Sequence, residues 1–178
     1  MISLLTERKV DEAGVVLAKD IYNPDLSSNI IEAMGKLKFD TPDIIKALIG
    51  FLGDTEPYIR QGAIRALGLI GNQVTALPIS KLLSDVSNVS MHTMTTAELA
   101  AETLLKFDTP VANDKAADYY IERLQASEYD SGEWHSAEIK LDRINTPKVH
   151  AAVKEIRELK IKEKNKTIVC SNKKQNRS

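Results

Sequence analysis

Residues 51–72, with the sequence FLGDTEPYIRQGAIRALGLIGN, decide the fold of this chain. Their apolar positions recur every three or four residues, a spacing that places them on one side of a helix. Thr55-Glu56-Pro57 supplies a capping hydroxyl, an acid for the first turn and a proline where a missing N–H costs nothing, so we expect a helix to begin at about Glu56. Gly71-Asn72 suits the left-handed conformation that closes helices, and we expect the helix to end there. The positions expected on the buried side are Ile59, Ala63, Ala66, Leu67 and Ile70.

Other parts of the chain repeat this unit more loosely. The segment LKFDTP at residues 37–42 returns unchanged at residues 105–110, and a weaker copy, INTP, occupies residues 144–147. Each copy ends one helix with an apolar residue, offers an Asp or Asn and a Thr as caps, and opens the next helix with proline. The intervals fit two repeats of 34 residues followed by one of 37, which is typical of helical-hairpin arrays.

The central stretch resembles a HEAT repeat, of the subtype found in phycobilisome-lyase-like proteins. The resemblance implies two antiparallel helices per repeat, a seam of alanines that lets helices approach closely, and hairpins that stack into a curved solenoid. It also implies that Asp54 and Arg60 form a structural ladder of polar contacts between neighbouring repeats and have no catalytic role. The residues that carry the match are Leu52, Asp54, Pro57, Ile59-Arg60, Ala63, Ala66-Leu67-Gly68, Ile70-Gly71, Ala76, Pro78 and Leu82-Leu83.

We therefore predict an all-α fold, a right-handed α-α superhelix of about four helical hairpins closed by a C-terminal capping helix. This HEAT-like solenoid is expected to form one domain over residues 1–165, followed by a basic, disordered tail over residues 166–178. The expected helices are Thr6–Ile21, Asp25–Lys38, Pro42–Phe51, Glu56–Gly71, Val74–Ser84, His92–Phe107, Pro110–Ser127, Gly132–Ile144 and Pro147–Lys164.

Charge is distributed unevenly. Residues 1–147 carry 14 basic and 22 acidic side chains, a formal charge of −8, whereas residues 148–178 carry 10 basic and 3 acidic ones, a formal charge of +7. The single cysteine, Cys170, cannot form an intramolecular disulfide, which favours a reducing compartment. The first apolar run, at residues 2–5, is too short for a secretion signal or a membrane span. We expect a cytoplasmic protein.

Residue patterns for catalysis are absent from the sequence. The three histidines, His92, His135 and His150, lie far apart, and none belongs to a two-histidine helical motif that would hold a metal ion. We predict no catalytic residue, no metal site and no cofactor, and hence a protein that is not an enzyme.

A binding surface is the remaining kind of site. The resemblance implies that the second helix of each repeat lines the concave side of the solenoid. Aligning the repeats on Ala33, Ala66 and Ala137 brings six outward positions into register as a mixed-charge ridge, which favours a protein partner over a nucleic acid. The predicted ridge residues are Glu32, Lys36, Arg65, Leu69, Ser136 and Lys140.

The favoured hypothesis is a scaffold or adaptor that binds a protein partner as a component of a larger complex. A first alternative, suggested by the resemblance, is a bilin lyase-like or chromophore-handling subunit. A second alternative is nucleic-acid binding through the basic tail, which the acidic body opposes.

Overall fold

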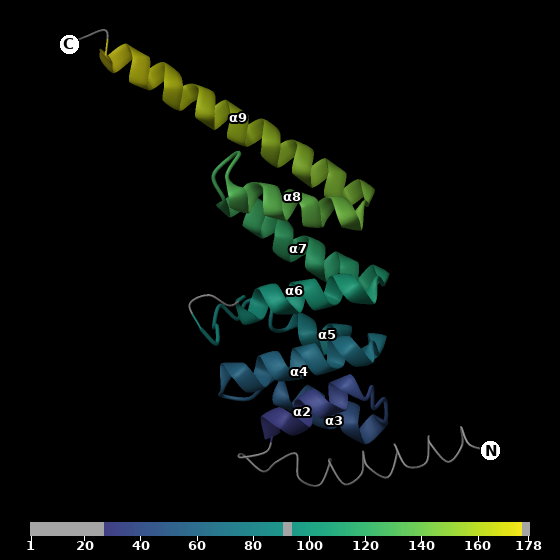
Figure 1. Cartoon of the computed structure of the whole chain (residues 1–178). Helices are drawn as coiled ribbons and strands as arrows, with labels where there is room; N and C mark the ends of the chain where they lie inside the picture. Colours follow the sequence, from purple (N-terminus) through teal and green to yellow (C-terminus); the bar gives the residue numbers. More distant parts are fainter. Residues whose placement is uncertain (1–26, 91–93, 176–178) are drawn as a thin grey trace. The chain divides into compact units, whose positions relative to one another are not determined.

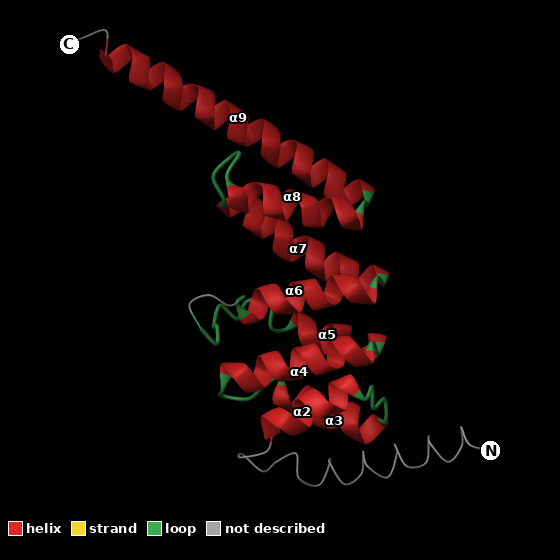
Figure 2. Cartoon of the chain, in the orientation of Figure 1, coloured by secondary structure: helices red, strands yellow, loops and turns green. Residues whose placement is uncertain are grey.

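The computed structural model describes residues 27–90 and 94–175, and all regular elements within these ranges are helices (Figure 2). The all-α prediction is therefore confirmed, while the predicted helix Thr6–Ile21 lies outside the described residues. The elements, labelled in Figure 1, are α2 (Ser27–Lys36), α3 (Pro42–Phe51), α4 (Pro57–Ile70), η1 (Gln73–Thr75), α5 (Ala76–Ser80), α6 (Thr96–Phe107), α7 (Pro110–Ala126), α8 (Gly132–Ile144) and α9 (Pro147–Gln175).

The chain divides into two compact units, Met1–Ala116 and Ala117–Ser178, and the expected single domain over residues 1–165 stays a prediction. In arrays of helical hairpins each repeat contacts its neighbours alone, so a boundary can fall between any two repeats. The boundary here lies inside α7.

Proline sets the start of four helices. Pro42, Pro57, Pro110 and Pro147 are the first residues of α3, α4, α7 and α9. The first helical N–H has no partner within a helix, and the fixed φ of proline is already helical, so proline at this position stabilises the boundary. These four starts agree with the sequence prediction to within one residue.

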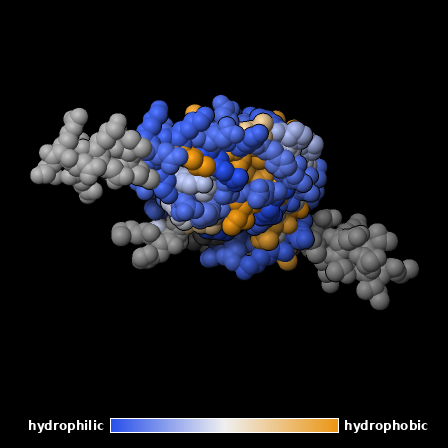
Figure 3. Space-filling model, turned by 90° about the horizontal axis from the view of Figure 1, so that it is seen from above, coloured by the Kyte–Doolittle hydropathy of each residue, from blue (hydrophilic) through white to orange (hydrophobic). Residues whose placement is uncertain are grey.

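Helix α4 is the centre of the first unit, where it contacts α2, α3 and α6. Its buried face contains Ile59, Ala63, Ala66 and Leu67, as predicted, together with Gln61 and Ile64. Ile70, also predicted on this face, is the last residue of the helix and is only partly buried. On the face drawn in Figure 3, hydrophilic residues predominate and apolar residues form smaller groups between them.

Small residues let α2 and α4 approach closely. A Cβ atom added to Gly35 would lie 2.6 Å from the Cα of Ala66, a distance that real side chains do not reach. Gly35 in α2 and Ala66 in α4 therefore form the tightest part of this helix pair. Helix α4 ends as the sequence predicts, because Gly71 has a φ of 79° and its N–H donates to the carbonyl of Leu67.

Two boundaries in the third hairpin differ from the prediction. The helix expected over Val74–Ser84 is broken into the short η1 and α5, and Pro78 lies within α5. Helix α6 begins at Thr96 and not at His92, because Thr95 and Glu98 form a capping box. The Thr95 hydroxyl accepts the Glu98 N–H at 3.2 Å, and the Glu98 carboxylate accepts the Thr95 N–H at 2.9 Å.

The second unit contains the end of α7, all of α8 and α9. Trp134 of α8 is buried and makes an edge-to-face contact with Tyr129, with 5.1 Å between ring centroids. Helix α9 continues to Gln175. The sequence had predicted that it ends near Lys164 and that the residues from 166 onward are disordered. Residues 165–175 contain neither proline nor glycine, so no residue in them interrupts the helical backbone.

Candidate functional site

A surface groove of about 360 Å³ lies along α2 and α4 in the first unit. Helix α2 contributes Glu32 and Lys36, and the loop before α6 contributes Val89. The residues that α4 contributes are Tyr58, Gln61, Gly62, Arg65, Ala66 and Leu69.

Three large side chains around this groove are unusually exposed. Tyr58, Leu69 and Val89 are 45%, 49% and 50% exposed. Gly62, between Tyr58 and Leu69 on α4, has no side chain and is partly exposed, whereas Ala66 is buried against Gly35. The groove therefore offers apolar surface to a partner, which is a property of interaction sites.

Arg65 is oriented from beneath by a buried amide. The Nη2 group of Arg65 donates to Oε1 of Gln61 at 3.1 Å. Gln61 has no exposed surface, and its Nε2 group donates to the carbonyl of Met94 at 3.1 Å. No carboxylate within the described ranges pairs with Arg65, so its charge faces the groove uncompensated.

Glu32 and Lys36 form an ion pair one helical turn apart on α2, and both side chains are more than 60% exposed. The hydrogen bond from Lys36, and then its charge, lower the pKa of Glu32. The pair is nearly neutral as a unit, so Arg65 gives the groove its net positive charge.

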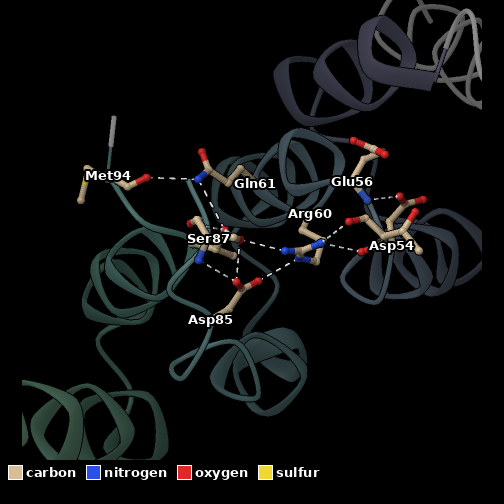
Figure 4. A network of polar contacts seen from close by, with 9 residues as sticks. Asp54, Glu56, Arg60, Gln61, Asp85, Ser87 and Met94 are labelled. Atoms are coloured by element: carbon tan, nitrogen blue, oxygen red, sulfur yellow. Dashed lines mark hydrogen bonds and ion pairs between the residues drawn. The ribbon is translucent and has the colours of Figure 1, made fainter. Parts of the chain in front are cut away.

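Arg60 of α4 organises a polar cluster that is connected to Gln61 through Ser87 and Thr96 (Figure 4). Its Nη1 group donates to the backbone carbonyls of Asp54 at 2.7 Å and Thr55 at 2.9 Å, in the turn before α4. Its Nε group donates to Oδ2 of Asp85 and its Nη2 group to the hydroxyl of Ser87, both at 2.8 Å. One guanidinium thus joins the turn of its own hairpin to the turn of the next.

Asp85 and Ser87 hold the start of the loop that leads to α6. Oδ1 of Asp85 accepts the N–H of Ser87 at 3.0 Å and its hydroxyl at 2.6 Å. The backbone carbonyls of Asp85 and Ser87 accept the N–H groups of Ala97 and Thr96, both at 2.8 Å. The loop is therefore fixed at both ends by hydrogen bonds to the first turn of α6.

The electrostatic state of Asp85 follows from these contacts. Burial raises the pKa of its carboxyl, but the hydrogen bonds from Ser87 and Arg60 and the charge of Arg60 together lower the pKa below its ordinary value. Asp85 is ionised at neutral pH and acts as the anionic half of the contact. Arg60, Asp85 and Ser87 all use their side chains in hydrogen bonds that hold turns in place. The cluster is therefore a structural link between two hairpins.

The first unit thus combines short helices, a close approach of small residues at Gly35 and Ala66, and a polar link between successive turns. Residues 16–89 match the family model for HEAT repeats. The match supports a HEAT-repeat family, and with the helical architecture it confirms the α-α solenoid class. It covers HEAT repeats in general, so the narrower resemblance to phycobilisome-lyase-like proteins stays a prediction. No curated protein sequence matches the chain.

The structure brings together four of the six predicted ridge residues. Glu32 and Lys36 come from α2, Arg65 and Leu69 come from α4, and all four line the groove. The other two, Ser136 and Lys140, belong to α8 in the second unit. Whether any of the six binds a partner stays a prediction.

The predicted ladder residues, Asp54 and Arg60, are in contact, but through the backbone carbonyl of Asp54. The Asp54 carboxylate instead accepts the N–H of Glu56 at 2.9 Å and so shapes the turn before α4. The ion pair of Arg60 is made with Asp85, in the turn of the next helical hairpin.

Sequence reasoning missed Asp85, Ser87 and Gln61. A signal for Asp85 was present, because Leu83-Ser84-Asp85 repeats the apolar, small, acidic order of Leu52-Gly53-Asp54. Gln61 gave no signal, since a polar residue on a helix is exposed by default and its burial depends on the loop that covers it.

Among the residues that the structure describes, no group of three His, Cys, Asp or Glu side chains is placed so that it could hold a metal ion. None of the described helices combines the length and the apolar character needed to cross a bilayer.

Proposed function

We propose that this chain is a non-catalytic HEAT-repeat adaptor of the cytoplasm that binds a protein partner in the groove along α2 and α4, as one component of a larger complex. The observation that carries the proposal is the meeting of exposed apolar side chains, Tyr58, Leu69 and Val89, with the oriented charge of Arg65 in one groove. Protein interfaces combine an apolar centre with arginine and a polar rim in this way.

The surface elsewhere agrees with an adaptor role. Two polar clusters of the first unit, the capping box of α6 and the link made by Arg60, are engaged in structural contacts. A helical repeat offers a long surface built from equivalent positions of successive helices, and binding to such a surface is how repeat proteins generally act.

The test is a purification of the tagged full-length chain from its native cell, followed by mass spectrometry. The test variant carries Lys36→Glu and Arg65→Glu. A matched control carries Lys46→Glu and Arg143→Glu, two exposed positions outside the groove with the same change in charge. We expect a protein recovered in stoichiometric amount with the wild type and the control but lost with the test variant. Equal recovery with all three proteins would contradict the assignment of the groove.

A second candidate function is binding of nucleic acid by α9. Its residues Lys162, Lys164 and Lys166 are exposed on a helix, and the Lys164 ammonium lies 5.4 Å from the centre of the Tyr129 ring. Clustered cations beside an aromatic ring suit a polyanion. The test is binding of labelled oligonucleotides at two salt concentrations by the wild type and by Lys162→Glu/Lys166→Glu. Binding unaffected by salt and by the substitutions would exclude this candidate.

A further inference from the structure

We propose that the groove along α2 and α4 takes a short, extended segment of a partner protein that presents a carboxylate to Arg65 and an apolar side chain to the space between Tyr58 and Leu69. This inference rests on the proposed adaptor function and names the chemistry of the partner.

The carboxylate follows from the way Arg65 is held. Its Nη2 group is anchored by Oε1 of Gln61, and Gln61 is held in turn by the carbonyl of Met94 and the hydroxyl of Thr96, at 3.1 and 3.4 Å. A guanidinium oriented before binding loses little entropy when a ligand arrives. Its other N–H groups have no partner among the described residues, and a carboxylate can accept two of them at once.

The apolar side chain follows from the walls of the groove. Tyr58 and Leu69 lie eleven positions apart on α4, with Gly62 and Ala66 between them on the lining. A side chain placed in this space would cover exposed surface of Tyr58 and Leu69, and Val89 would cover it from the loop side. The volume of about 360 Å³ suits a few side chains of a segment and not a whole folded face.

The charges that line the groove disfavour a basic segment or a nucleic acid as the partner. Lys36 is paired with Glu32, so Arg65 is the cation that remains for a ligand. A basic segment would bring its charge against Arg65 without compensation. A nucleic acid needs several cations along its backbone and bases need aromatic stacking, whereas this groove has one uncompensated cation and one aromatic ring.

The experiment is selection of peptides from a library of random short sequences on the immobilised full-length chain. Selected peptides are then synthesised in three forms: unchanged, with each acidic residue replaced by its amide, and with the apolar residue replaced by serine. Their dissociation constants are measured against the wild type, Arg65→Gln, Leu69→Glu and the control Arg143→Gln, which makes the same change in the second unit. Circular dichroism verifies that each variant is helical.

We expect the selected peptides to contain Asp or Glu near a large apolar residue. The amide form of the peptide, or Arg65→Gln in the protein, is expected to weaken binding about tenfold, and the two changes together should add little. Leu69→Glu should abolish binding, and Arg143→Gln should leave it unchanged.

Other outcomes separate this inference from the proposed function. If peptides bind equally in acid and amide forms, but Leu69→Glu abolishes binding, the groove binds protein and the inference about the carboxylate is wrong. If no peptide is selected while the native complex is still lost with Lys36→Glu/Arg65→Glu, the adaptor proposal stands and the short segment is wrong. If neither experiment detects a groove-dependent partner, both proposals are wrong.

Discussion

Arg60 of α4 and Asp85 in the following turn form an ion pair, with 2.8 Å between Nε and Oδ2. Both side chains are shielded from water, since they are 13% and 18% exposed. The same guanidinium also binds the carbonyls of Asp54 and Thr55. This pair therefore contributes to the packing of one helical hairpin against the next, and its removal should weaken that packing.

Arg60→Ala should lower the free energy of unfolding by about 1–3 kcal/mol, because it leaves a partly buried carboxylate and two carbonyls without their donor. Asp85→Ala should cost a similar amount, and a double-mutant cycle should give a coupling energy of about 1–2 kcal/mol between the two residues. Urea denaturation followed by circular dichroism measures all four proteins.

The exposed pair Lys148 and Asp118, with 3.2 Å between Nζ and Oδ1, is the matched control. Its side chains are 58% and 49% exposed, so the same cycle there should give less than about 0.5 kcal/mol. Equal coupling energies in the two cycles would mean that Arg60 and Asp85 contribute no more than a surface pair.

Asp85 also predicts a pH dependence. Its pKa is lower in the folded chain than in the unfolded chain, so its ionised form stabilises the fold above the unfolded pKa of about 3.9, and this contribution is lost as the pH falls through the folded pKa. When the pH is lowered from about 5 to about 3, the free energy of unfolding should fall by more in the wild type than in Asp85→Asn. Parallel decreases in the free energy of unfolding of the two proteins would contradict this assignment.

Gly35→Ala should destabilise the fold by about 1–3 kcal/mol, because the new methyl group overlaps the backbone of Ala66. Gly50→Ala in α3 is the control, since a Cβ atom there meets nothing within 4 Å. The control should be stabilised by about 0.5–1 kcal/mol from the lower entropy of its unfolded chain. Thermal melting of both variants measures the contrast, and a tolerated alanine at Gly35 would show that α2 and α4 can separate.

Thr95→Ala should cost about 1 kcal/mol, because it removes the hydroxyl that accepts the Glu98 N–H at the start of α6. Thr41 also precedes a helix, but its side chain makes no capping hydrogen bond. Thr41→Ala should therefore change the free energy of unfolding by less than about 0.5 kcal/mol. Similar losses in the two variants would show that the capping box is not formed in solution.

The helix starts could be predicted because they depend on local chemistry. Pro42 and Pro57 fix the first residue of α3 and α4, and Gly71 fixes the end of α4, with no need of distant partners. The start of α6 was missed although Thr95 and Glu98 have the spacing of a capping box. Nothing local decided between that box and an earlier start near His92.

The groove could be predicted in part for a different reason. Equivalent positions on successive helices of a repeat lie next to one another, so alignment alone brought Glu32 and Arg65 together. The burial of Gln61 and the approach of Val89 could not be predicted, because both depend on the path of the loop between α5 and α6. That path depends on the contacts of Asp85 and Ser87, which are distant in sequence from the groove residues of α2.

In the loop before α6, different residues maintain the packing of the helices and form the wall of the groove. The N–H groups of Ala97 and Thr96 donate hydrogen bonds to the carbonyls of Asp85 and Ser87 and hold the two ends of the loop together, while Val89 between them forms part of the groove wall. Doubling the length of such a fastened loop costs only about 0.6 kcal/mol of closure entropy. Insertions and substitutions around Val89 can therefore change what the groove accepts while the helices keep their packing, so the binding preference can evolve, or be engineered, independently of stability.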